Sequence, residues 1–152
     1  MALSGIQTKQ ITIKSDGDLF HELLRYRPHQ LVDISPEYIK GVNLNDGHEW
    51  GTVGSILTWT YLHEGKQKVA KETLEAIDED KKSVCYNVIG GDILEAYKTF
   101  MTTVDVDTNG EENVVTWTFH YEKLNGSVPN PDSLMDFALS VTKDIETHHL
   151  KN

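Results

Sequence analysis

The stretch that decides the fold is the last long segment of the chain, residues 131–150, PDSLMDFALSVTKDIETHHL. Its apolar residues recur at intervals of three and four, which places them on one side of an α-helix. Asn130 can cap this helix, and Pro131 suits its first position, where an N–H group would have no partner. The pattern therefore predicts one long amphipathic helix. Its apolar stripe consists of Leu134, Phe137, Ala138, Val141 and Ile145.

The segments before this helix alternate between apolar and polar residues, as strands with one buried face do. Turn-forming residues separate them, which is typical of an antiparallel sheet. We expect strands at residues 6–14, 38–44, 55–62, 67–77, 83–89, 93–106 and 113–122. No break in composition indicates a second domain, so residues 1–152 are expected to form a single domain.

Two shorter helices are expected between the first strand and the second. Ser15 and Asp18 have the spacing of a capping box, and the apolar residues that follow them predict a short amphipathic helix. Arg27 and Pro28 end it, because a residue before proline avoids the helical conformation. Residues 28–36 admit a second short helix, and a loop begins at Asn45-Asp46-Gly47.

Composition narrows the function classes. The chain has 152 residues, with 14 Lys and Arg against 24 Asp and Glu, and a net charge of −10. This balance argues against nucleic-acid binding and against anionic membrane surfaces. We see no signal peptide and no apolar run long enough for a membrane span, so we expect a cytoplasmic protein without integral membrane association. The single cysteine, Cys85, fits a reducing compartment, and nothing in the sequence demands more than a monomer.

The motifs of common catalytic and cofactor sites are missing. The glycine-rich loop at residues 45–54 has no Lys and precedes a strand, unlike a nucleotide-binding loop. The seven histidines lack the spacing of metal ligands, and Cys85 has no activating motif. We therefore expect no catalytic nucleophile, no metal and no cofactor.

Strand alternation assigns large rings with polar tips to one face of the sheet. Val53, Leu57, Trp59 and Tyr61 are expected on this face, and Thr102 is expected on the opposite one. Buried Tyr and Trp need partners for their polar atoms, so this composition is unusual for a packed core. Alternation gives direction and not volume, so it leaves open whether these side chains fill a core or line a pocket.

Several segments, in order along the chain, resemble the plant major latex protein family, which belongs to the birch-pollen-allergen superfamily and is related to lipid-transfer START domains. They are residues 46–55 (DGHEWGTVGS), 71–78, 89–98 (IGGDILEAYK), 117–123 and 141–146. The resemblance implies an α+β fold in which a seven-stranded curved antiparallel sheet wraps around a long C-terminal helix, with two short helices. It also implies an internal hydrophobic cavity between sheet and helix.

The resemblance further implies a binding or carrier protein for hydrophobic or amphipathic small molecules, such as steroid-like compounds, phenolics, cytokinins or lipids, in a plant stress or defence context. The alternative is a pocket enzyme of the same superfamily, an isomerase, cyclase or ribonuclease-like protein, in which a desolvated Lys71 could act as a base. The gate and latch motifs of the superfamily's hormone receptors are missing. The expected ligand-binding residues are Leu57, Trp59, Tyr61, Val69, Lys71, Val84, Tyr86, Val88, Tyr97, Thr99, Met101, Thr103, Val115, Trp117, Phe119, Tyr121, Leu134, Phe137, Ala138, Val141 and Ile145.

Overall fold

Seven antiparallel strands form one sheet in the order β1-β7-β6-β5-β4-β3-β2. The structure is a computed structural model that describes residues 3–45 and 47–151; Asp46, which the sequence places in a loop, lies outside the described residues, as do the ends of the range 1–152. The strands are β1 (Ser4–Ile13), β2 (Ile39–Leu44), β3 (Ile56–His63), β4 (Lys66–Asp78), β5 (Ser83–Gly91), β6 (Tyr97–Asn109) and β7 (Glu112–Lys123). Hairpins join β3 through β7 in sequence, whereas β1 pairs with β7 at one edge and β2 pairs with β3 at the other.

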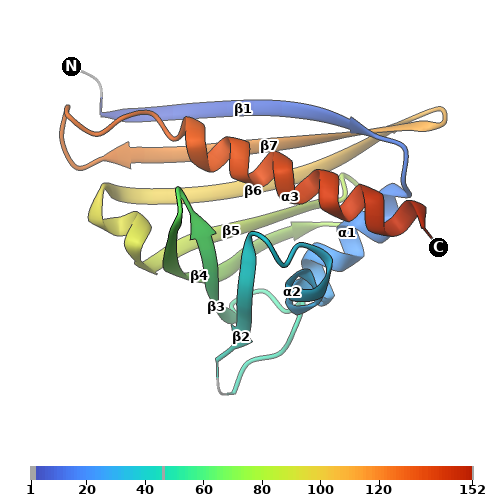
Figure 1. Ribbon diagram of the computed structural model, residues 1–152, viewed down its shortest axis with the longest axis horizontal. Helices are drawn as coiled ribbons and strands as arrows, with labels where there is room; N and C mark the ends of the chain where they lie inside the picture. Colours follow the sequence, from blue (N-terminus) through green and yellow to red (C-terminus); the bar gives the residue numbers. More distant parts are fainter. Residues whose placement is uncertain (1–2, 46, 152) are drawn as a thin grey trace.

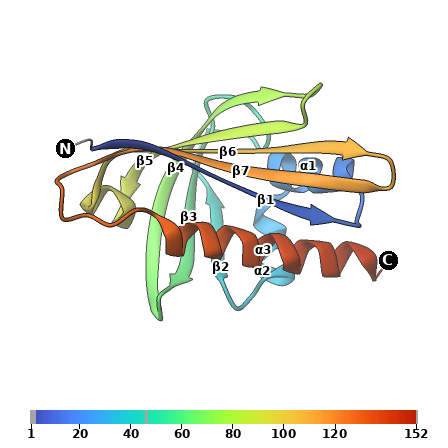
Figure 2. The same cartoon turned by 90° about the horizontal axis from the view of Figure 1, so that it is seen from above.

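Three α-helices and two short 3₁₀ segments complete the fold. They are α1 (Gly17–Tyr26), η1 (Pro28–Gln30), α2 (Leu31–Ile34), η2 (Asp92–Glu95) and α3 (Asp132–Leu150). Figure 1 shows α3 running across the molecule, with α1 and α2 near its C-terminal half. Figure 2 shows that β1, β6 and β7 run along α3, whereas β2 and β3 cross it steeply. The sheet is therefore strongly curved and wraps around the helix, as the resemblance implies.

The helix ends differ in detail from the sequence-based expectation. Asp16, not Ser15, caps α1, because its carboxylate accepts the backbone N–H groups of Asp18 and Leu19. At α3 the capping position is Pro131, which can offer no side-chain hydrogen bond, and Asn130 does not cap the helix. In both cases the residue types were read correctly as a helix start, but the cap lies one position further along the chain.

The expected strand at residues 93–106 is wrong at its start. Asp92–Glu95 form the 3₁₀ segment η2, and β6 begins only at Tyr97. The strand then continues beyond Val106 to Asn109. Gly91 precedes η2 with a φ of 100°, and a Cβ atom there would lie 2.2 Å from the Val69 carbonyl oxygen. Only glycine therefore fits at this junction, where the chain leaves β5 and turns back.

The two halves of α3 are held differently against the sheet. In the C-terminal half, Thr142 and Ile145 are fully buried. The Trp117 indole Nε1 donates to the Thr142 hydroxyl at 2.9 Å, and that hydroxyl donates to the Ala138 carbonyl at 2.8 Å. In the first turn, a 3.0 Å hydrogen bond joins His63 Nε2 on β3 to the hydroxyl of exposed Ser133.

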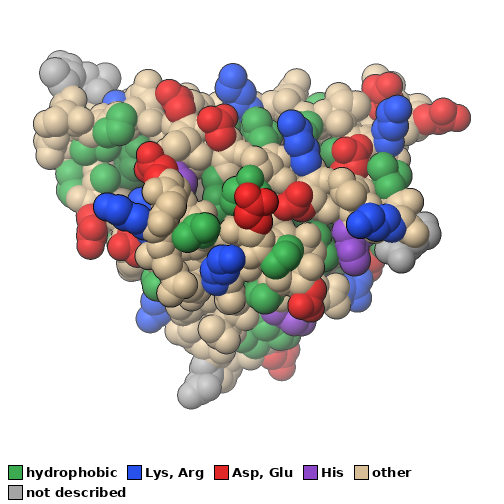
Figure 3. Space-filling view, in the orientation of Figure 1, with side chains coloured by type: hydrophobic (Ala, Val, Ile, Leu, Met, Phe, Trp, Pro, Cys, Tyr) green, Lys and Arg blue, Asp and Glu red, His purple; other side chains and the backbone are tan. Residues whose placement is uncertain are grey.

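The outer face of the molecule that carries α3 is polar. Figure 3 shows acidic and basic side chains of both signs on this face, with hydrophobic side chains scattered between them. Within the described residues, no helix has the length and apolar character needed to cross a membrane.

Candidate functional site

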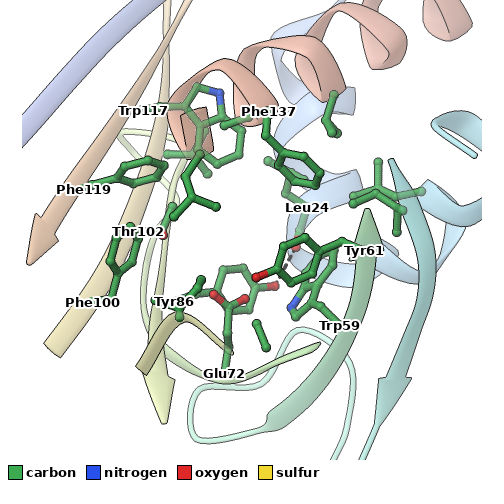
Figure 4. Close-up of a pocket in the computed structure, with 18 residues that line it drawn as sticks. Leu24, Trp59, Tyr61, Glu72, Tyr86, Phe100, Thr102, Trp117, Phe119 and Phe137 are labelled. Carbon is green, nitrogen blue, oxygen red and sulfur yellow. Dashed lines mark hydrogen bonds between the residues drawn. The ribbon is translucent and has the colours of Figure 1, made fainter. Parts of the chain in front are cut away.

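A cavity of about 140 Å³ lies between α3 and the concave face of the sheet. Aromatic and aliphatic side chains from nearly every element point into it, and Figure 4 shows how they surround the space. An apolar cavity of about this size can hold a single aromatic ring, so a larger ligand would require side chains of the lining to move. The lining consists of Leu24, Leu31, Ile39, Trp59, Tyr61, Ala70, Glu72, Tyr86, Ile93, Phe100, Thr102, Val104, Trp117, Phe119, Leu134, Phe137, Ala138 and Val141.

The polar groups of this cavity gather in one corner, which we call the polar corner and define as Trp59, Tyr61, Glu72 and Tyr86. These side chains come from the adjacent strands β3, β4 and β5. The Tyr86 hydroxyl donates to the Leu24 carbonyl at 2.8 Å. Within the described part of the chain, the Trp59 indole N–H and the Tyr61 hydroxyl are buried without a hydrogen-bond partner. Leaving two buried donors without a partner in an apolar cavity is costly.

Glu72 is the acidic residue of this corner, and burial changes its ionisation. Removal from water raises the pKa of its carboxyl from the ordinary value of 4.5 to about 7. Burial also raises the pKa of Tyr61 and Tyr86, and the negative charge of Glu72 adds to the effect on both phenols. At neutral pH the cavity therefore contains two neutral phenols and one carboxyl group that is partly ionised.

The structure places many of the expected binding residues around the cavity. Those that line it are Trp59, Tyr61, Tyr86, Trp117, Phe119, Leu134, Phe137, Ala138 and Val141. Others are buried elsewhere in the interior, namely Leu57, Val84, Val88, Tyr97, Val115 and Ile145. Tyr121 is half-buried, packs its ring on Phe100 and directs its hydroxyl to Asn130 at 3.4 Å. Contact with a ligand stays a prediction for all of them.

Two expected positions on β4 face away from the cavity. Val69 is 39% exposed and Lys71 is also exposed, whereas Ala70 and Glu72 point inward. The inward face expected for this part of β4 is therefore wrong by one residue. Lys71 therefore lies outside the cavity and cannot serve as a base within it.

Three expected positions on β6 are also on the wrong face. Thr99, Met101 and Thr103 lie on the outer side of the sheet, whereas Phe100 and Thr102 line the cavity. A register shift between Tyr97 and Thr99 causes this change. An irregularity of this kind moves every later side chain to the other face, so alternation counted from Tyr97 fails.

Val53 was expected to share the inward face of β3, but it precedes that strand and is 55% exposed. Sequence reasoning also missed half of the lining. Leu24 lies on the apolar face of α1, so helical spacing could have indicated it, but nothing in the alternation pointed to Glu72. The missed residues are Leu24, Leu31, Ile39, Ala70, Glu72, Ile93, Phe100, Thr102 and Val104.

Other kinds of site find little support in the geometry. Among residues 3–45 and 47–151, no group of three or more His, Cys, Asp or Glu side chains is arranged to hold a metal ion. Cys85 is a free, half-buried thiol on β5. The cavity between α3 and the sheet, with its apolar walls and few polar groups, remains the candidate site.

A curved seven-stranded sheet closed by a C-terminal helix over an apolar cavity is a ligand-binding fold. The chain belongs to the pathogenesis-related protein Bet v 1 family, whose profile matches residues 2–152. Its curated relatives include MLP-like protein 34 from Arabidopsis thaliana, 41% identical over 143 residues, and MLP-like protein 28 from the same plant, 39% identical over 151 residues. These alignments cover 93% and 98% of this chain but only 45% of each relative, so the chain spans less than half the length of either protein.

Solved structures agree with this assignment. The crystal structure of ginseng major latex-like protein 151 from Panax ginseng has a TM-score of 0.95 and 50% sequence identity, over 98% of this chain and 99% of that one. Norcoclaurine synthase from Thalictrum flavum, solved in complex with dopamine and hydroxybenzaldehyde, has a TM-score of 0.72 and 17% identity, over 95% of this chain and 88% of the other. The second likeness concerns the fold alone, and it shows that the same architecture also occurs in an enzyme.

Proposed function

We propose that residues 1–152 form a single domain that binds hydrophobic or amphipathic small molecules and acts as a non-catalytic carrier. The ligand would be a steroid-like, phenolic, cytokinin or lipid molecule. The protein would act in the cytoplasm of a plant cell under stress or attack. The protein would act as a monomer without nucleic-acid partners. The apolar cavity beneath α3 is the observation that carries this proposal.

The cavity supplies the driving force for binding. Its walls are mostly aromatic and aliphatic, so an apolar ligand would leave water for a dry surface, at about 25 cal/mol per Å² of buried area before association costs. Phe137 forms edge-on contacts with the rings of Tyr38 and Tyr61, with centroids 5.7 and 5.5 Å apart. Because these contacts lie at the edge of the cavity, rotation of Phe137 would change the space available to a ligand.

To test the proposal, a substitution fills the cavity, and the loss of ligand affinity is measured. Ala138→Phe places a ring where a buried methyl group of α3 now lines the space, whereas Ala76→Phe adds the same ring at an exposed position of β4. We expect 1-anilinonaphthalene-8-sulfonate fluorescence to report binding to the wild type and to Ala76→Phe, and to fall at least about tenfold in affinity for Ala138→Phe. Equal binding by all three proteins, with unchanged circular dichroism, would place the ligand site elsewhere.

Glu72 favours a second candidate function, a pocket enzyme using acid–base chemistry. A carboxyl group with a pKa of about 7 is matched to proton transfer at neutral pH, and the hydroxyl groups of Tyr61 and Tyr86 lie in the same corner. The norcoclaurine synthase neighbour carries out chemistry on the same fold. Liquid chromatography with mass spectrometry of the ligand recovered after incubation separates the two functions, because a carrier returns its ligand with unchanged mass and unchanged retention time, whereas an isomerase changes the retention time even where the mass stays the same.

A further inference from the structure

The carboxyl group of Glu72 in the polar corner has no cationic partner among the described lining residues of the cavity. Within residues 3–45 and 47–151, the carboxylate of Glu72 takes part in no hydrogen bond and no ion pair. The acidic side chains that do form ion pairs lie at the surface, such as Glu122 with Lys98. A buried carboxylate is normally found with a cation or with several donors, because its charge loses the stabilisation that water gives. A free cation from outside the chain would meet this need.

Aromatic rings surround the same carboxylate. Trp59 and Tyr86 have centroids 6.3 Å apart and planes at 87°, so they form two walls of a corner rather than a stack. Figure 4 shows the Tyr61 ring beside them, with its hydroxyl directed toward the Glu72 carboxylate. The faces of Trp and Tyr rings attract cations, and a desolvated ammonium group gains most from such a site. Rings and carboxylate together have the composition of an ammonium-binding site.

The remaining neighbours of Glu72 do not compete for this role. From β3 the facing groups are Trp59 and Tyr61, and from β5 Tyr86; both phenols are held neutral by raised pKa values. From β6 the neighbour is the uncharged Thr102. The 3₁₀ segment η2 contributes Asp92, whose carboxylate is engaged with the Val69 backbone N–H at 2.7 Å. The described lining residues of α1, α2, β2, β7 and α3 carry no charge.

We infer that the cavity selects hydrophobic amines in their protonated form, with the ammonium group at Glu72 among the rings of Trp59, Tyr61 and Tyr86. This inference rests on the proposed binding function and names its ligand class. The apolar body of the amine lies toward α3, against Phe137 and Trp117. The ammonium donates to Glu72, and the Tyr61 oxygen accepts a second of its hydrogens. A ligand of the same shape with a neutral or negative end lacks the attraction to Glu72.

Binding is coupled to a proton. An ammonium group favours the ionised form of Glu72, so a protonated Glu72 releases its proton to solvent when the amine binds. Because the pKa of Glu72 is about 7 in the empty protein, affinity for the amine rises between pH 6 and pH 8. The amine itself stays charged over this interval, since alkylammonium groups titrate near pH 10.

The test uses three probes that share one ring: 2-phenylethylamine, 2-phenylethanol and phenylacetate. Dissociation constants come from NMR shift titrations of the full chain at pH 6 and pH 8. For the wild type at pH 8 we expect the amine to bind about tenfold more tightly than the alcohol, with phenylacetate the weakest. Glu72→Gln removes the charge but keeps the shape, and we expect it to bind amine and alcohol about equally at both pH values.

Glu75→Gln is the matched control, because it removes the same charge from an exposed position of the same strand. It should keep the amine preference of the wild type. Equal affinity of the wild type for amine and alcohol would overturn the inference and leave the proposed carrier function standing. An amine preference that survives in a folded Glu72→Gln protein would also overturn it. Failure of all three probes to bind the wild type would reject the carrier function as well.

Discussion

The two halves of α3 lie on the same sheet but meet different surroundings. In the C-terminal half, Thr142 and Ile145 are fully buried, and the ring of Trp117 is fixed by a hydrogen bond to the helix. In the first half, Leu134, Phe137 and Ala138 border the cavity. One helix therefore combines a tightly packed end that stabilises the fold with a loosely packed end that leaves room for a ligand. Changes in the two halves should have different consequences.

The largest effect is expected from Ile145→Ala in the packed half. Ile145 is fully buried, and its truncation should lower the free energy of unfolding by about 4 kcal/mol, because the surrounding core cannot collapse into the space. Urea unfolding followed by circular dichroism measures the loss. Leu150→Ala on the same helix is the control, since Leu150 is 55% exposed and should cost almost nothing. Equal losses for the two variants would contradict tight packing at this end.

The next largest effect is the change in stability with pH that Glu72 causes from within the cavity. The pKa of Glu72 is raised to about 7 in the folded protein, so the folded protein holds the proton of this carboxyl group more tightly than the unfolded chain does. The stabilisation is complete below pH 4.5 and is lost as the pH rises through 7. Between pH 4.5 and pH 8.5 the wild type should therefore lose about 3 kcal/mol relative to Glu72→Gln. Thermal or urea unfolding of both proteins across this range tests the difference, with Glu75→Gln expected to follow the wild type.

Thr142→Val, in the packed half of α3, should lower the free energy of unfolding by an intermediate amount. The substitution keeps the shape but removes the acceptor of the Trp117 indole N–H, and a buried donor without a partner costs about 2 kcal/mol. Thr142→Ser retains the hydroxyl and should lose less. If valine proved as stable as threonine in urea unfolding, the hydrogen bond would not be what fixes the helix to β7.

The smallest change in stability is expected where the cavity leaves room. Phe137→Leu should cost about 1 kcal/mol, because the ring already borders empty space and gives up only part of its contacts. Phe20→Leu, at a fully buried position of the hydrophobic core, should cost clearly more. Urea unfolding compares the two. A larger loss for Phe137→Leu would mean that the cavity edge is packed as tightly as the core.

Much of the fold could be predicted because its signals are local and repeated. The apolar stripe of residues 131–150 indicates α3, and alternation indicates the strands to within a few residues at most ends. On β3, β5 and β7 the alternation also gives the correct inward rings, because those strands are regular where they face the cavity. The ordered family segments then supplied what local patterns do not contain, namely the curvature of the sheet and the hollow beneath the helix.

The cavity was harder to predict for two physical reasons. The register shift at the start of β6 reverses the faces, and the sequence carries no clear mark of it. On β4 the pattern is inverted by the site itself, since the inward residue Glu72 is charged and the outward residue Val69 is apolar. Alternation assumes that polar residues face water, and a binding site is where that assumption fails.

The Thr142 hydroxyl uses its proton on the Ala138 carbonyl and its oxygen on Trp117. It thereby fixes the register of α3 on β7 about midway along the helix, whereas the first turn is joined to the sheet by the side chain of the exposed Ser133. A helix anchored at its middle cannot slide along the sheet, but its first turns can change their distance from the sheet if the surface contact of Ser133 breaks. Movement of the first turns of α3 would then make room for ligands of different size, while the contacts of the anchored half keep the protein folded.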